Sequence, residues 1–247
     1  MKKTIAIILG RMGSKGVKDK NVMKLNRKPL YSYSFAAAKK SKYVQNIFVS
    51  TDHPIIKKAA LKNKFNYISR PKKINHDKAL FDDALIYSYE KAVKKLGFMP
   101  DYVVILMCNV ATINETLIDK AIESLEKNKD ADSAVTVSMF NMYSPLRARR
   151  LNKKGFLDPF IPFESFGDPN KLNCDRESQG DTYFADMSHS VVRSECLMNI
   201  KHGMLPQKWM GNNIIPIINN WGCDIDDPWQ IDMSLRWIKN KKNEKNN

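Results

Sequence analysis

The sequence lacks the features that would indicate a zinc protein, a disulfide scaffold or a membrane protein. Its four cysteines are widely spaced and form no CxxC pair, which excludes the usual zinc and redox motifs. No apolar run approaches the roughly 18 residues of a spanning helix, and the run near the N-terminus is too short for a signal peptide. We therefore expect a cytoplasmic protein without a membrane segment.

Charge is strongly biased, because 41 Lys and Arg residues face 26 Asp and Glu residues, a formal net charge of +15. Such an excess makes anionic partners a natural expectation. However, the sequence contains no arginine-rich stripe interleaved with aromatics and no named nucleic-acid-binding module. Nucleic-acid binding is therefore kept only as an alternative.

Short runs rich in Ile and Val alternate with helical patterns through the first half of the chain. The predicted strands are 4–9, 46–50, 102–107 and 133–137, and the predicted helices are 28–42, 52–63, 79–97, 114–128 and 228–240. Expected helix signals are Pro29 at a first helical position, Asp52 and Asn114 as caps, and Gly97 as a stop. The alternation predicts an α/β fold: a Rossmann-like, mostly parallel sheet with helices on both faces. We expect one domain over residues 1–247.

The regular pattern breaks in the segment 141–182, which has many aromatics and prolines but no sustained period. A long irregular segment inside a compact domain is usually a lid, a binding loop or an arm exchanged between subunits. We expect its aromatics to pack at a subunit interface rather than to bind a ligand. They are Tyr143, Phe156, Phe160, Phe163 and Phe166.

The stretch "IAIILGRMGSKGVKDKNV", residues 5–22, joins a buried strand to a loop with three glycines and several basic side chains. Glycines let backbone N–H groups approach an anion closely, and Arg11, Lys15 and Lys20 add charged donors. The loop matches neither GxxxxGK[ST] nor GxGxxG. It predicts a binding site for a phosphate-bearing ligand, although a turn with solvated lysines would have the same composition.

A second motif, "WGCDIDDPWQ", places Asp224 and Asp226 one residue apart. In extended backbone both side chains point to the same face, so both carboxylates can meet one hard cation. Mg²⁺ is bound by few carboxylates together with water and phosphate oxygens. The alternative is an acidic helix entry in which Asp227 caps the helix that begins at Pro228. Together, the basic loop and the aspartate pair indicate a nucleotide–Mg²⁺ site.

These residues resemble a known family. "GRMGSKGVKDKNVMKLNRKPLYSYSFAAAKKSK", "IFVSTD" and "SRPKKINHD" are similar to the opening of the acylneuraminate cytidylyltransferases, and "DIDDPWQID" resembles their closing metal motif. The resemblance implies a nucleotide-diphospho-sugar transferase type of fold and an enzyme that joins CTP to an acidic sugar, releasing pyrophosphate. It further implies Mg²⁺ as cofactor and a homodimer built in part by the protruding segment.

The resemblance also assigns roles to residues. It implies catalytic roles for Arg11, Lys20 and Asp226 and a metal site at Asp224 and Asp226. The implied nucleotide-binding residues are Leu9, Gly10, Arg11, Gly13, Ser14, Lys15, Lys20, Asn21, Arg70 and Asp77. The implied acceptor-binding residues are Asn109, Arg176, Tyr183, Ser188 and His189.

The acceptor half departs from the family pattern. Where the family usually has a QPTSPLR-like run, this chain reads "MCNVATIN", with Met107 in place of a polar residue and Ala111 in place of proline. Ser188 and His189 replace an expected Asn-Gly or Asn-Ala pair, and Arg176 is a candidate anchor for a carboxylate or phosphonate. His189 fits either a proton carrier or an interior residue. The acceptor is therefore expected to be anionic but not necessarily sialic acid.

Several alternatives remain open at this point. The enzyme could use CTP with a phosphonate or phosphate acceptor, or could use GTP or UTP, since other nucleotide transferases share the fold class. A nucleotide-binding regulatory protein without activity is the alternative outside enzymes.

Overall fold

A computed structural model describes residues 2–13, 16–76, 78–175 and 179–246. Its centre is a seven-stranded sheet in the order β11-β7-β10-β6-β1-β4-β5. Among the described strands of this sheet, β10 alone runs antiparallel to its neighbours. The predicted mostly parallel α/β fold is confirmed. The strands are β1 (Thr4–Gly10), β4 (Asn46–Thr51), β5 (Asn66–Ile68), β6 (Tyr102–Met107), β7 (Ser133–Met139), β10 (Tyr183–Arg193) and β11 (Ile214–Ile218).

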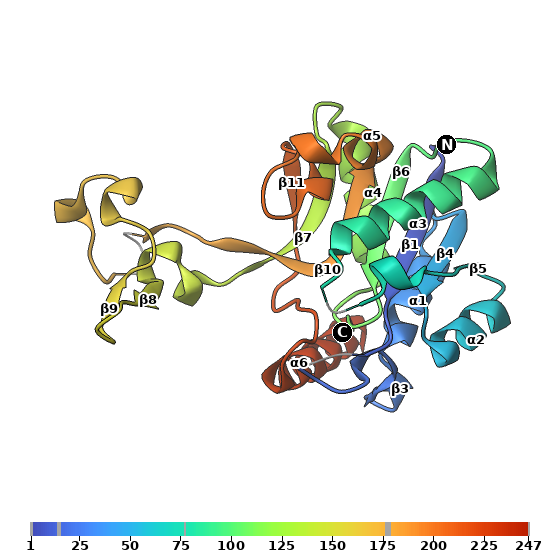
Figure 1. Cartoon of the computed structure of the whole chain (residues 1–247), viewed down its shortest axis with the longest axis horizontal. Helices are drawn as coiled ribbons and strands as arrows, with labels where there is room; N and C mark the ends of the chain where they lie inside the picture. Colours follow the sequence, from blue (N-terminus) through green and yellow to red (C-terminus); the bar gives the residue numbers. More distant parts are fainter. Residues whose placement is uncertain (1, 14–15, 77, 176–178, 247) are drawn as a thin grey trace.

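Helices cover both faces of this sheet, as Figure 1 shows. The helices are α1 (Tyr31–Lys40), α2 (Pro54–Lys62), α3 (Phe81–Leu96), α4 (Glu115–Lys127), α5 (Ser194–Met198) and α6 (Pro228–Asn246). Because side chains alternate along β1, Ala6 and Ile8 pack against α1, α2 and α4, whereas Ile5 and Ile7 pack against α3 and α5. A third cluster holds α6 against the hairpin of β2 (Lys24–Leu25) and β3 (Lys28–Pro29), with Trp237 contributing from α6 and Leu25 from the hairpin.

Two predicted helix ends are correct and two are not. Asn114 accepts a hydrogen bond from the Leu117 N–H at 3.0 Å, and Gly97 ends α3 with a φ of 72°. Asp52 does not cap α2, because His53 Nδ1 accepts the Ile55 N–H at 3.2 Å instead. Pro29 lies in β3, so α1 begins only at Tyr31.

The segment between β7 and β10 projects from the body of the molecule as an arm (Figure 1). Its only described sheet is the hairpin of β8 (Arg149–Leu151) and β9 (Leu157–Pro159). Large apolar side chains on this arm are exposed, including Phe156 at 68% and Phe160 at 58%. Among the described helices of the whole chain, none is long and apolar enough to span a bilayer.

Candidate active site

The loop after β1 begins at a close approach between two strands. A Cβ on Gly10 would lie 2.5 Å from the Cys108 Sγ just beyond β6, so a larger residue would force the strand ends apart. Gly13 has a φ of 77°, a left-handed conformation that glycine adopts without strain. The Asp52 carboxylate accepts the Met12 N–H at 2.6 Å, and the Asn21 amide donates to the Arg11 carbonyl at 2.8 Å. These bonds fix the basic loop at the carboxyl end of β1, where ligands bind in such sheets.

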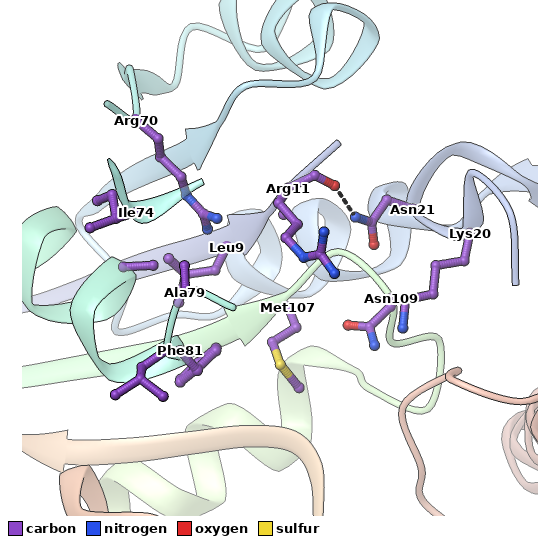
Figure 2. Close-up of a pocket in the computed structure, with 13 residues that line it drawn as sticks. Leu9, Arg11, Lys20, Asn21, Arg70, Ile74, Ala79, Phe81, Met107 and Asn109 are labelled. Atoms are coloured by element: carbon purple, nitrogen blue, oxygen red, sulfur yellow. Dashed lines mark hydrogen bonds between the residues drawn. The ribbon is translucent and has the colours of Figure 1, made fainter. Parts of the chain in front are cut away.

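A cavity of about 190 Å³ opens beside this loop (Figure 2). Figure 2 shows that the side chains of Arg11, Lys20 and Arg70 converge on it from different elements. Its far wall is the start of α3, which sequence reasoning did not assign to the site. The lining residues are Leu9, Gly10, Arg11, Lys20, Asn21, Arg70, Ile74, Ala79, Leu80, Phe81, Ala84, Met107 and Asn109.

Arg70 is a half-buried cation of the cavity. Arg70 follows the end of β5, and its Nε donates to the Oγ of Ser50 in β4 at 3.1 Å, which fixes the guanidinium. Burial lowers the pKa of Arg70 from its ordinary value, although an arginine keeps its charge at any physiological pH. A positive charge in so little water interacts strongly with an anionic ligand.

The aspartate pair lies at the same place as the basic loop, although some two hundred residues separate them. Lys20 Nζ and Asp226 Oδ1 form an ion pair, and a Cβ on Gly16 would overlap the Asp226 carbonyl oxygen. Asn109 Nδ2 lies 3.2 Å from Asp224 Oδ2 and 3.4 Å from Asp226 Oδ1. A single amide therefore contacts both carboxylates, which can converge on one cation.

The segment carrying these carboxylates is held by main-chain bonds. Asp224 forms an antiparallel bridge with Val110, and the Ile225 N–H donates to the Asn109 carbonyl at 2.9 Å. The Gln230 Oε1 accepts the N–H groups of Asp226 and Asp227 at 2.7 and 2.6 Å, so it caps the start of α6. Asp227 therefore directly precedes the helix, but the side chain that binds these main-chain N–H groups is that of Gln230 rather than that of Asp227.

Asp224 and Asp226 form an electrostatically unfavourable pair. Burial, and then the like charge of Asp226, raises the pKa of Asp224 to about 6, against an opposing effect of Lys20. A divalent cation would relieve this repulsion, and carboxylate oxygens are ligands that Mg²⁺ prefers. Within the described ranges no group of three or more His, Cys, Asp and Glu side chains is arranged so that it could hold a metal ion. Two carboxylates nevertheless fit Mg²⁺, which keeps several waters and takes substrate phosphate oxygens.

The predicted acceptor residues do not form one group. Asn109 lines the cavity. Tyr183 lies at the start of β10 and is 50% exposed. Ser188 and His189, at 0% and 1% exposure, do not line the cavity, so the expectation that they contact an acceptor does not fit their burial.

Four predicted site residues, Ser14, Lys15, Asp77 and Arg176, lie outside the residues that the structure describes.

The burial of His189 leads to a prediction about how the stability of the fold depends on pH. Burial lowers the pKa of this imidazole to about 3, against an opposing effect of the Leu117 main chain. The unfolded chain protonates His189 near pH 6.5 and the folded chain does not, so protonation favours the unfolded state and the free energy of unfolding falls as the pH drops below 6.5. About 2 kcal/mol should be lost between pH 7 and pH 5. Urea unfolding of His189→Leu should show a shallower decline than the parent; equal slopes would contradict the prediction.

Comparison with known proteins identifies cytidylyltransferases as relatives of this chain. A family model described as Cytidylyltransferase matches residues 5–155. A Helicobacter pylori protein named pseudaminic acid cytidylyltransferase and UDP-2,4-diacetamido-2,4,6-trideoxy-beta-L-altropyranose hydrolase is 30% identical over 147 residues, 59% of this chain and 28% of that one. The N-acylneuraminate cytidylyltransferase of Escherichia coli is 38% identical over 77 residues, 31% of this chain and 18% of that one. The matches thus span less than a third of these relatives.

Solved structures share the fold across nearly the whole chain. A CMP:2-keto-3-deoxy-manno-octonic acid synthetase complexed with CTP superposes with a TM-score of 0.64 at 13% identity, covering 97% of this chain and 99% of that one. A 4-diphosphocytidyl-2C-methyl-D-erythritol synthase gives a TM-score of 0.65 at 9% identity, covering 96% and 99%. At such identities the likeness establishes the fold alone.

Proposed function

The chain belongs to the cytidylyltransferase family, and from this premise we propose that it couples CTP to an acidic sugar, forming a CMP-activated product and pyrophosphate. One observation carries the proposal: the Asp224–Asp226 pair lies against the residues of the cavity, because Lys20 and Asn109 line the cavity and contact the aspartates. A cytoplasmic location, where CTP is available, is part of the proposal.

The charge of the cavity lining suits the triphosphate of a nucleotide, because Arg11, Lys20 and Arg70 all line it. We assign the triphosphate to Arg11, Lys20 and the loop glycines, and the nucleoside to the enclosed side between Arg70 and the start of α3. When an acceptor hydroxyl attacks the α-phosphorus, negative charge increases on the phosphate oxygens and on the departing pyrophosphate. Fixed cations in a site with little water stabilise that charge most where it develops. The roles of Arg11 and Lys20 are therefore positioning and charge stabilisation.

Asp224 and Asp226 are the proposed ligands of Mg²⁺. When bound, the ion supplies positive charge to the phosphate oxygens. Lys20, which pairs with Asp226, would be released from that carboxylate to face the triphosphate. Asn109 orients both carboxylates through its amide.

The relatives' names include pseudaminic acid and N-acylneuraminate, both acidic sugars, and we propose an acceptor of this class. Asn109, which contacts both aspartates, and Met107, which lies next to it in Figure 2, line the cavity and would meet the acceptor. The apolar Met107 side chain argues for a sugar with an apolar group at this contact. A phosphonate or phosphate acceptor for CTP is the second candidate, because it would bring the same anionic charge to the cavity.

We also propose that the arm forms a homodimer. Its exposed apolar side chains include Phe156, Leu157 and Phe160, each more than half exposed in the single chain. Replacing Phe156 and Phe160 by aspartate should convert a dimer to a monomer, because two charges would have to be buried in the interface. Light scattering after size exclusion measures the mass directly. The matched control replaces Ile55 and Leu61 on α2 by aspartate. Each of these residues is 54% exposed, and the control should leave the dimer intact. A monomeric parent would contradict the proposal.

The function is tested by pyrophosphate release. The four nucleoside triphosphates are compared with Mg²⁺ and a panel of acceptors: N-acetylneuraminate, pseudaminic acid, 2-keto-3-deoxyoctonate, a phosphonate and inorganic phosphate. We expect turnover with CTP and one or more sugar acids. Turnover only with the phosphonate or phosphate would favour the second candidate. Preference for GTP or UTP, or CTP binding without any turnover, would contradict the proposed function.

A further inference from the structure

A buried cluster of polar side chains lies behind the aspartate pair and takes no part in the proposed chemistry. We call it the Asn219 cluster. Every member is at most 6% exposed, yet the members come from five separate parts of the chain. They are Thr112, Ser138, Asp186, Ser188, Asn219 and Trp237. Burying so many polar groups destabilises a fold unless each is hydrogen-bonded, so the bonds of the cluster show what it holds in place.

Asn219, which follows β11, is the centre of the cluster. Its Oδ1 accepts from the Trp237 indole N–H on α6 at 2.9 Å. An indole nitrogen can only donate, so this bond fixes the orientation of the amide. The Nδ2 then lies 3.0 Å from the Thr112 carbonyl, 2.9 Å from Asp186 Oδ2 and 3.1 Å from Ser188 Oγ. The start of the segment leading to Asp224 is thereby attached to α6, to β10 and to the connection between β6 and α4.

Thr112 holds the other end of the same segment. Its Oγ1 accepts the Cys223 N–H at 3.0 Å and lies 2.9 Å from the Cys223 carbonyl oxygen, to which it donates. Both main-chain polar groups of the residue directly before Asp224 are therefore bound by one side chain. Gly222 lies against Asp186 so closely that a Cβ would overlap that carboxylate. The backbone from Asn219 to Cys223 is thus fixed at each end and cannot shift independently of the cluster.

We propose that Thr112 and Asn219 are positioning residues that set the affinity of the Asp224–Asp226 pair for a divalent cation, an inference that rests on the proposed function. Neither residue touches the cavity. Both act on Asp224 through the main chain. Once the backbone of Cys223 is fixed, the Asp224 carboxylate can move only by rotation about the bonds of Asp224 itself. Asn109 then fixes the two carboxylates relative to each other from the opposite side. Outer groups that orient metal ligands typically change metal affinity by about 10- to 100-fold when they are removed.

The test compares Thr112→Val with Thr112→Ser. Valine keeps the shape and removes the hydroxyl, whereas serine keeps the hydroxyl and thus both bonds to Cys223. Mn²⁺ binding is measured by electron paramagnetic resonance of the free ion, with and without CTP, and CTP binding by calorimetry in EDTA. We expect Thr112→Val to raise the Mn²⁺ dissociation constant about tenfold. Thr112→Ser should stay within about twofold, and CTP affinity without metal should not change in either variant.

Two further variants keep the inference testable if Thr112→Val folds poorly. Trp237→Phe removes the indole N–H that orients Asn219 while keeping an aromatic ring at this position, and should weaken Mn²⁺ binding severalfold. Trp229→Phe on the same helix is its control, because Trp229 is 51% exposed and lies outside the cluster. Ser194→Ala, another buried hydroxyl bonded to a carbonyl, should leave Mn²⁺ binding unchanged.

Two outcomes would overturn different statements. Wild-type Mn²⁺ affinity in both Thr112→Val and Trp237→Phe would overturn the positioning role while leaving the proposed function intact. A parent protein that binds no Mn²⁺, with or without CTP, would overturn the metal site on which the proposed function depends.

Discussion

Asp226→Asn is expected to lower kcat for pyrophosphate release about a thousand-fold. The amide keeps the size of the side chain but removes the charge that pairs with Lys20 and, in our proposal, holds Mg²⁺. Losing one directed electrostatic interaction in an active site commonly lowers the rate by about 100- to 1,000-fold. Losing a metal ligand likewise weakens the stabilisation of the charge that develops on the phosphate oxygens. The loss should appear at saturating CTP, because stabilisation of the developing phosphate charge is what disappears.

The fold should not change in this variant, since the Asp226 side chain is 62% exposed. Its thermal unfolding should therefore match that of the parent. Asp232→Asn is the matched control, because Asp232 is an exposed aspartate farther along α6. Turnover by Asp226→Asn within a few-fold of the parent would mean that the metal site lies elsewhere.

Lys20→Met has the second largest expected effect, a loss of about 100-fold or more in kcat. The Lys20 side chain is only 14% exposed, pairs with Asp226 and lines the cavity, so its charge acts with little screening by water. Methionine keeps the length of the stem and removes the charge. Lys24→Met, at an exposed position in β2, is the control and should behave as the parent.

This variant also separates charge stabilisation from metal binding. Lys20 competes with a cation for Asp226, so Lys20→Met should bind Mn²⁺ at least as tightly as the parent while turnover falls. Weaker Mn²⁺ binding together with unimpaired turnover would contradict the role proposed for Lys20. The combination of opposite effects is difficult to produce by general misfolding.

Several parts of the fold were predictable because they depend on local pattern. The Ile- and Val-rich runs of β1, β4, β6 and β7 are buried on both faces, so their hydrophobicity is continuous and visible in sequence. The stop at Gly97 and the cap at Asn114 follow from backbone preferences of single residues. By contrast, β11 contains Pro216 and half-buried positions at the sheet edge, which do not form a strand pattern.

The site was predictable where it depends on charge type and strand ends, and not where it depends on tertiary contact. The sequence marks the basic loop and the aspartate pair, but the bond from Asp52 to Met12 can be recognised only once β4 lies beside β1. The sequence pattern predicts the Asp52 carboxylate as a helix cap, but His53 caps α2 instead. The wall formed by Leu80 and Phe81 carries no sequence signal, because it depends on where α3 begins relative to the strand ends.

The convergence of the loop after β1 and the Asp224–Asp226 pair on one metal–nucleotide complex can be measured by phosphorus NMR of CTP with substoichiometric Mn²⁺. With the parent protein, bound Mn²⁺ should broaden all three phosphate resonances strongly, and Asp224→Asn should abolish most of this protein-dependent broadening. Equal broadening with the parent and with Asp224→Asn would contradict the convergence, because the ion would then be held without the aspartate pair.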